Sequence, residues 1–289
     1  MALFQSLEKI YDLYLSLLLL ALEINKTARL YLEKSKTKHL STFEDLNPKT
    51  LFIDNRIIST LAKNKRFNKH LEQKKIQWSS EFDFPGKIFR EIRQWKDYQE
   101  YLSGNENGFE KDKKIWIDIY KNFILHSEEL HLHFEEKNIH WEDDITLAGL
   151  SVIKTLELLK PETSEEESIL IPLYKDEAED AEFARELFRK TILSESEFSK
   201  MISEKAANWE LDRIAVADMI LMKMALCELL RFENIPIKVS LNEYIELSKE
   251  YSTPQSKTFI NGILDKIVID LKSSGKIIKK GRGLIGFMF

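Results

Sequence analysis

The chain has 289 residues, of which 43% are hydrophobic and 31% are charged, with 9 glycines, 6 prolines and one cysteine. So few turn-forming residues favour long helices, and a single cysteine, Cys227, excludes an internal disulfide and a cysteine-rich zinc site. The formal net charge of -5 argues against a protein that coats nucleic acid with its whole surface. Residues 1–80 are nevertheless locally basic, with 14 Lys and Arg against 8 Asp and Glu.

The first predicted region, residues 1–159, is helical and begins with a long helix. Residues 4–36 keep apolar side chains at helical spacing, which predicts one amphipathic helix. The apolar run at residues 13–22 covers about half of the roughly 20 residues that a membrane span requires, so it indicates a buried helix. Because the run also lacks a signal-peptide pattern, we expect a cytoplasmic protein with no membrane partner.

Shorter helices are expected to complete this N-terminal helical region. Asp54 is predicted to cap a helix over residues 55–64, and a largely solvated helix follows. Pro85 marks the first turn of a helix that is expected to end near Ser103. A glycine-containing loop comes next. The helices expected after that loop include one that carries Trp116 and two over about residues 127–136 and 144–159.

Residues 160–175 are predicted to be a linker or exposed loop, because they begin with the polar, acidic sequence KPETSEEE. Residues 176–275 are predicted to form a helical core, and residues 276–289 a basic C-terminal tail. The core helices are expected over about residues 176–193, 195–207 and 211–232, followed by two that are capped by Ser240 with Glu243, and by Ser252 or Thr253.

Three segments of this core form one combined pattern. Its residues are Arg213, Asp218, Ile220, Leu221, Ala225, Glu228 and Leu229, then Ile235, Pro236, Lys238, Val239, Asn242, Glu243, Ile245, Glu246 and Leu247, and then Ser256 and Phe259 to Lys266. Taken together, these segments resemble the signature of the NusB family of transcription antitermination factors. The resemblance covers about a quarter of the chain, and the length is similar to that of the enlarged, Bacteroidetes-type members.

The resemblance implies an all-α, NusB-like bundle of two subdomains with an enlarged N-terminal helical region. It also implies a protein that is not an enzyme and needs no cofactor. The expected partners are ribosomal protein S10 (NusE), a boxA-type single-stranded RNA and the RNA polymerase antitermination complex, in support of ribosomal RNA transcription. The expected mechanism is assembly, in which each partner contributes part of the RNA-binding surface.

The same resemblance assigns candidate binding residues. Phe259 is expected to stack on an unpaired base, although packing into the core would also explain it. The start of its helix would favour phosphate. Candidates for RNA binding are Asp212, Arg213, Ser256, Lys257, Thr258, Phe259, Lys279 and Arg282. Candidates for contact with the protein partner are Asp218, Glu243 and Glu246. Solvated helix surfaces and a disordered tail are the alternatives for the charged members of both sets.

The chain also departs from the family pattern at its start. Family members open with an arginine-rich helix that contacts RNA, whereas no arginine precedes Arg29 here. Either the start is truncated or the RNA-binding arm is absent. The alternative function is therefore a protein-binding helical scaffold without RNA binding. An RNA methyltransferase with a NusB-like domain is not expected, because little sequence follows the signature.

No catalytic or metal-binding motif is present. The histidines at positions 126, 131, 133 and 140 lack the HExxH order, so a solvated helix explains them better than a metal site. Phosphate-binding and nucleophile motifs such as the P-loop, GxGxxG and GxSxG are also missing from the sequence.

Overall fold

The computed structural model describes residues 2–37, 42–78, 83–104, 108–138, 141, 144–206 and 214–284. Within these ranges every regular element is a helix, which confirms the predicted all-α fold. The chain divides into two compact units, Met1–Leu173 and Tyr174–Phe289. Among the described helices, none combines the length and the apolar character that a membrane span needs.

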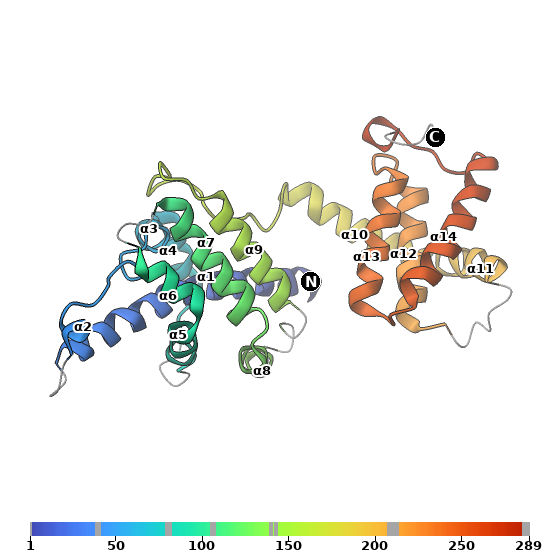
Figure 1. Cartoon of the computed structure of the whole chain (residues 1–289). Coiled ribbons are helices and arrows are strands. Elements are labelled where there is room, and N and C mark those ends of the chain that lie inside the picture. Colours follow the sequence, from blue (N-terminus) through green and yellow to red (C-terminus); the bar gives the residue numbers. More distant parts are fainter. Residues whose placement is uncertain are drawn as a thin grey trace. The chain divides into compact units, whose positions relative to one another are not determined.

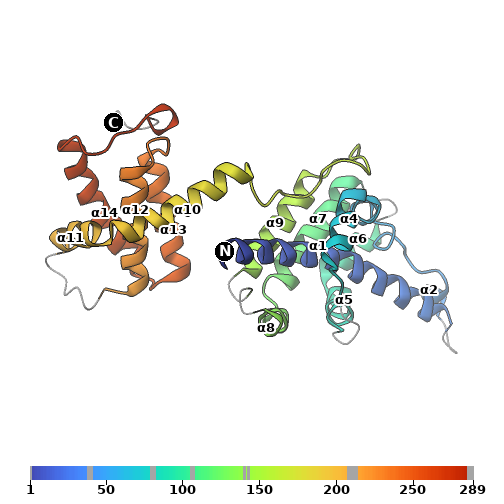
Figure 2. The same cartoon turned by 180° about the vertical axis from the view of Figure 1, so that it is seen from behind.

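The first unit is organised around the long helix α1, Ala2–Lys36, which confirms the predicted amphipathic helix. The leucines at positions 13, 15, 17, 18 and 20 are fully buried against the other helices. α1 packs against α9 (Ile145–Leu158), α5 (Phe84–Gln94) and α3 (Arg56–Lys63), and this arrangement is visible from both sides in Figures 1 and 2. Burial of these apolar faces supplies the unit's main stabilisation.

The remaining helices of the first unit are short and differ from the sequence prediction at two ends. Asn55, and not Asp54, caps α3, since its side chain accepts from the backbone N–H groups of Ile57 and Ile58. The helix whose first turn contains Pro85 ends at Gln94, because Trp95 is extended and packs its ring against Phe123. The other elements are α2 (Phe43–Leu46), α4 (Lys65–Lys74), α6 (Lys96–Ser103), α7 (Phe109–Ile119), the π-helical η1 (Tyr120–Ile124) and α8 (Glu128–Lys137).

A buried polar network joins α3, α6 and α7. The Tyr101 hydroxyl donates to Asp112 Oδ1 at 2.6 Å, and the backbone N–H of Arg56 donates to Asp112 Oδ2 at 3.1 Å. The Asn55 amide donates to the backbone carbonyl of Asp112 at 3.0 Å. These bonds satisfy the buried Asp112, which is only 4% exposed, so the network fixes the three helices against one another.

The segment predicted as a linker runs along the first unit before the second begins. The backbone N–H of Lys65 donates to the Glu165 carbonyl at 2.8 Å, and the Asn64 amide donates to the Glu167 carbonyl at 2.9 Å. Ile169 is buried in the core of this unit. Residues 165–169 are therefore held against the N-terminal end of α4.

The second unit surrounds α12, Val216–Arg231, with four other helices. α12 packs against each of them, and α14 also contacts α11 and α13. Met222, Ala225, Leu226 and Leu229 are fully buried, as the predicted apolar stripe requires. The surrounding helices are α10 (Glu177–Leu193), α11 (Glu195–Lys205), α13 (Ile237–Tyr251) and α14 (Ser256–Ser273).

The predicted capping box of α13 is wrong. α13 begins at Ile237, and the carbonyl of Pro236 accepts from the backbone N–H groups of Val239 and Ser240. Ser240 lies inside the helix, and its hydroxyl donates to the buried carboxylate of Glu228 at 2.7 Å. Proline has a fixed φ that is compatible with the start of a helix, so Pro236 determines where α13 begins.

The predicted cap of α14 is also displaced. The helix begins at Ser256, with Gln255 at the N-cap position and no side-chain cap bond. The Ser252 hydroxyl, expected to cap this helix, donates instead to Asp218 on α12. The Ser252 hydroxyl thus bonds to a residue distant in the sequence and not to the backbone at the start of α14.

The predicted disorder of the C-terminal tail is wrong for residues 276–284. Ile277 is buried in the core of the second unit, and η4 (Gly281–Leu284) is a short 3-10 helix. The Lys279 ammonium donates to the Phe232 carbonyl at 2.9 Å, and the Lys280 backbone N–H donates to the Glu233 carbonyl at 2.9 Å. This part of the tail is therefore fixed to the C-terminal end of α12.

Candidate nucleic-acid interface

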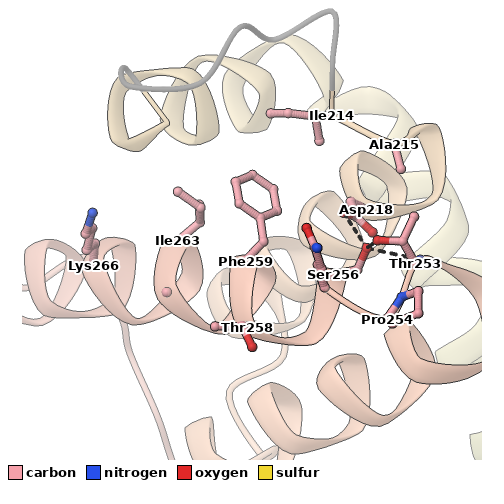
Figure 3. A pocket seen from close by; sticks show the side chains of 12 residues that line it. Ile214, Ala215, Asp218, Thr253, Pro254, Ser256, Thr258, Phe259, Ile263 and Lys266 are labelled. Carbon is pink, nitrogen blue, oxygen red and sulfur yellow. Dashed lines mark hydrogen bonds between the residues drawn. The ribbon is translucent and has the colours of Figure 1, made fainter.

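A groove of about 640 Å³ lies between the first turns of α12 and α14. Figure 3 shows the side chains that line it. One wall carries Ile214 and Ala215, which precede α12, and the other is a face of α14. The residues that line the groove are Ile214, Ala215, Asp218, Thr253, Pro254, Gln255, Ser256, Thr258, Phe259, Gly262, Ile263 and Lys266.

Asp218 is a buried wall of this groove. Its side chain is 4% exposed, and its carboxylate accepts hydrogen bonds from the hydroxyls of Ser252 and, at 2.8 Å, Ser256. The Ser256 oxygen in turn accepts from the backbone N–H of Thr253 at 3.2 Å. Asp218 therefore joins α12 to the start of α14, whereas the sequence placed it on or beside the polar face of α12 as a partner contact.

The buried position of Ser256 follows from the same bonds. Ser256 is 2% exposed, and its hydroxyl is fully used within the unit. The two residues that follow it, Lys257 and Thr258, are exposed. Of these two residues, Thr258 lines the groove, whereas the charge of Lys257 acts on the Glu246 carboxyl of α13.

An aromatic ring and an ammonium group share the open side of the groove. Phe259, Ile263 and Lys266 extend from the same side of α14, and the Phe259 ring points toward Ile214 (Figure 3). Phe259 is partly exposed and packs against the core of the second unit, so core packing accounts for part of this side chain. The sequence analysis did not select Lys266, although its spacing of seven residues from Phe259 indicates the same helical face.

This arrangement suits a segment of single-stranded RNA. The Phe259 ring is the aromatic side chain of the groove, and Lys266 supplies positive charge on the same wall. Described carboxylates near the opening are limited to Asp218, whose oxygens are occupied. The groove therefore combines an aromatic ring, an ammonium group and a buried carboxylate among its described lining residues.

Two of the predicted RNA-binding residues lie far from this groove, at the other end of α12. Lys279 is 6% exposed, and burial lowers the pKa of its ammonium. Arg282 is exposed. Fourteen positions separate Asp218 from Phe232, which Lys279 contacts, and they correspond to roughly 20 Å along the helix. The structure thus brings together Ser256, Lys257, Thr258 and Phe259, but not Lys279 and Arg282.

The predicted residues Asp212 and Arg213 lie outside the described residues. Glu243 and Glu246, predicted to contact the protein partner, are exposed on α13. A hydrogen bond from Lys249 lowers the pKa of the Glu246 carboxyl. Glu243 is thus the more accessible of the two charges for a partner.

No group of described side chains is arranged to hold a metal ion. His131, one of the histidines considered above, contacts the backbone carbonyl of Leu125 at 3.1 Å. His133 stacks near the Trp78 ring, with 6.3 Å between the ring centroids. These contacts are those of a packed helix.

Comparison with known proteins identifies the family to which the sequence of this chain is similar. The model described as NusB family matches residues 149–268, which include α12, α13 and most of α14. A transcription antitermination protein NusB from Salinibacter ruber is 48% identical over 118 residues, which are 41% of this chain and 73% of the relative.

Two further relatives carry the same name. The protein from Chloroherpeton thalassium is 41% identical over 104 residues, which cover 36% of this chain and 49% of the relative. The protein from Symbiobacterium thermophilum is 36% identical over 98 residues, which cover 34% of this chain and 64% of the relative. The chain therefore spans only about half of the second relative and less than two thirds of the third. No solved structure matches it.

Proposed function

Since this chain belongs to the NusB family of transcription antitermination proteins, we propose that it binds ribosomal protein S10 (NusE) and boxA-type RNA in an RNA polymerase antitermination complex. The family is non-enzymatic, so the proposed activity is assembly. The chain would present one surface to S10 and one to RNA, and the pair would bind RNA more tightly than either protein alone.

The observation that carries the RNA part of the proposal is the groove beside Phe259. An aromatic ring that is partly open to solvent, with an ammonium group one to two helical turns away, suits a base and a phosphate of one strand. Base stacking on an aromatic ring contributes about 1–3 kcal/mol per base. Each phosphate contact adds affinity that salt weakens, because bound cations are released from the RNA.

The exposed glutamates on α13 support the S10 part of the proposal. Ribosomal proteins are basic, and complementary charge accelerates the encounter and orients the partners. Glu243 and Glu246 lie one turn apart, so both can face the same surface of S10. We include them in the interface and leave out Asp218, whose carboxylate is buried.

The function is tested by measuring the affinity of labelled boxA RNA for the whole chain, with and without S10, over a salt series. We expect S10 to increase the affinity for boxA RNA more than for a scrambled RNA of equal length. The logarithm of the affinity should fall linearly with the logarithm of the salt concentration. No gain from S10 at any salt concentration would contradict the proposal.

The S10 surface is tested with matched charge reversals. Glu243→Lys should weaken S10 binding, because it places a cation against a basic partner. Glu204→Lys is the control, since Glu204 is an exposed glutamate on α11 and changes the net charge equally. Equal S10 affinity for the two variants would remove Glu243 from the interface.

The alternative is a protein-binding scaffold that does not bind RNA. The observation that favours it is the position of Lys279, a predicted RNA-binding cation that is buried against the end of α12. The same experiment separates the two functions. A scaffold would bind S10 with full affinity and leave boxA RNA free in both the presence and the absence of S10.

A further inference from the structure

The first unit contains a second groove, and its lining includes an arginine that has no carboxylate partner among the described residues. It has a volume of about 360 Å³ and lies between the end of α1, the segment after α2, the end of α5 and the start of α6. We call it the Arg93 groove. The residues that line it are Tyr31, Leu32, Ser35, Thr42, Asn47, Pro48, Lys49, Phe89, Arg93, Tyr98, Gln99 and Leu102.

Arg93 is the central feature of this groove. Its guanidinium carbon lies 3.8 Å from the centre of the Tyr31 ring, which fixes the side chain by a cation–π contact. The basic residues on either side along the chain have acidic partners: Arg90 lies 3.6 Å from Asp83, and Lys96 lies 3.3 Å from Glu100. Within the described part of the protein, no carboxylate lies within ion-pair distance of Arg93.

The other polar groups of the groove complement this charge. Lys49 is an exposed second cation, and the lining contains no aspartate or glutamate. The Asn47 amide nitrogen donates to the Phe43 carbonyl at 3.1 Å, and the Gln99 amide nitrogen donates to the Arg93 carbonyl at 2.6 Å. Each of these bonds uses one of the two N–H groups of the amide, and the carbonyl oxygens of both side chains can accept hydrogen bonds from a ligand.

Two cations, two amide oxygens and aromatic walls are the features that bind a nucleotide. Arginine forms paired hydrogen bonds with phosphate, and it is the residue that most often binds phosphate and flat rings together. Amide oxygens accept from the amino groups of adenine, cytosine or guanine. The volume is at the lower end of the roughly 300–1,000 Å³ of small-ligand sites, so the groove suits one nucleotide and excludes a duplex.

We propose that the Arg93 groove binds one nucleotide of single-stranded RNA, with the phosphate on Arg93 and Lys49 and the base beside Tyr31 and the amide oxygens of Asn47 and Gln99. The proposal rests on the proposed function in that RNA is the ligand, but it places the contact in a different unit from Phe259. The local excess of Lys and Arg in residues 1–80 would attract the RNA to this unit.

The test compares two arginine variants of the whole chain. Arg93→Met removes the proposed phosphate contact and keeps most of the side chain's length. Arg66→Met is the control, because Arg66 is an exposed arginine of the same unit and its loss changes the net charge equally. RNA that carries 4-thiouridine and extends beyond the boxA sequence on both sides is the probe.

We expect Arg93→Met to weaken RNA binding roughly tenfold and Arg66→Met to change it little. The slope of the logarithm of affinity against the logarithm of salt concentration should fall by about one phosphate contact in the Arg93 variant only. Cross-links to the peptides that contain Tyr31 or Phe89 should disappear in the same variant. Equal affinities for the two variants, or cross-links confined to the peptide that contains Phe259, would overturn the proposal.

A mononucleotide distinguishes this proposal from the proposed function. Saturation-transfer NMR with AMP measures contact between the ligand and the protein without requiring S10 or a long RNA. If the wild-type chain and Arg66→Met contact AMP and Arg93→Met does not, the groove is a nucleotide site even where boxA binding fails. If AMP contacts all three chains equally or none of them, and the RNA affinities of both variants agree, the nucleotide site is ruled out.

Discussion

Each unit of this protein buries an aspartate, and the two carboxylates have different consequences. Asp112 in the first unit and Asp218 in the second are both 4% exposed and both accept hydrogen bonds from hydroxyl groups. Asp112 joins α3, α6 and α7 through backbone and side-chain bonds, away from the Arg93 groove. Asp218 forms a wall of the groove beside Phe259. The first carboxylate maintains a fold, whereas the second maintains a fold and a candidate site together.

The largest expected effect is the loss of stability in Asp112→Ala. Removal of the carboxylate leaves the Tyr101 hydroxyl and the Arg56 N–H without their acceptor in a buried place, which costs about 2–4 kcal/mol of unfolding free energy. Tryptophan fluorescence in a urea titration reports this, because Trp78, Trp95, Trp116 and Trp141 belong to the first unit. Asp118→Ala on the same helix, which removes a surface ion pair with Lys114, should cost less than about 1 kcal/mol.

This prediction also tests the separation of the two roles. RNA affinity of Asp112→Ala should match the wild type under conditions in which both proteins are folded. A loss of affinity equal to that of a groove variant would mean that Asp112 supports the candidate site as Asp218 does.

The second effect concerns Asp218→Asn. The amide keeps the size of the carboxylate but accepts at only one oxygen, so the bonds from Ser252 and Ser256 cannot both persist. We expect a loss of about 1–2 kcal/mol in unfolding free energy and weaker RNA binding. Asp265→Asn is the control, since Asp265 is exposed on α14 and accepts from Asn261 at 3.0 Å. Lower stability with unchanged RNA affinity would show that Asp218, like Asp112, serves only the fold.

A smaller effect is expected at the other end of the second unit. Lys279→Met replaces a buried ammonium, whose bond to the Phe232 carbonyl is lost, with an apolar side chain of similar length. The two changes oppose each other, so the unfolding free energy should change by less than about 1 kcal/mol. RNA affinity and its salt dependence should match the wild type. A reduced salt dependence would place Lys279 among the phosphate contacts after all.

The smallest effect is a pH dependence on α10. Hydrogen bonds from Arg189 and Lys190 lower the pKa of the Glu186 carboxyl to about 2. The folded state therefore binds the proton less well than the unfolded state. The stabilisation is present above the unfolded pKa of about 4.5 and disappears as the pH falls toward 2.

Thermal unfolding of Glu186→Gln and the wild type over this range measures the effect. The difference between them should be small, because both partners reach solvent, and it should shrink in high salt. A difference that grows as the pH falls would have the opposite sign and contradict the assignment.

Local patterns predicted most of the helices, because apolar spacing is a property of consecutive residues. α1 and the buried stripe of α12 follow directly from it. The interruption at Trp95 was not predicted, since this residue is apolar and in phase with the stripe, and its ring is held by Phe123 from another element. The start of α13 was misplaced because Ser240 satisfies the local capping pattern while its hydroxyl bonds to Glu228.

The candidate site was predicted in part because some of its residues are consecutive. Phe259 and its neighbours belong to one short segment, so the sequence alone indicates that they lie together. The burial of Asp218 depends on Ser252 and Ser256, 34 and 38 positions later, and no local pattern contains that information. Lys279 was likewise predicted to lie in the tail, because its contact with the Phe232 carbonyl is between residues far apart in the sequence.

The most direct test of the central claim, that RNA bases stack on Phe259, compares three substitutions by equilibrium binding of boxA RNA in the presence of S10. Phe259→Leu keeps an apolar side chain on the core and removes the ring, whereas Phe259→Tyr keeps the ring. Phe188→Leu removes a ring that is 66% exposed on α10 and serves as the control. The account predicts a loss of about 1–3 kcal/mol in binding free energy for Phe259→Leu alone. Equal affinity for Phe259→Leu and Phe259→Tyr would contradict it.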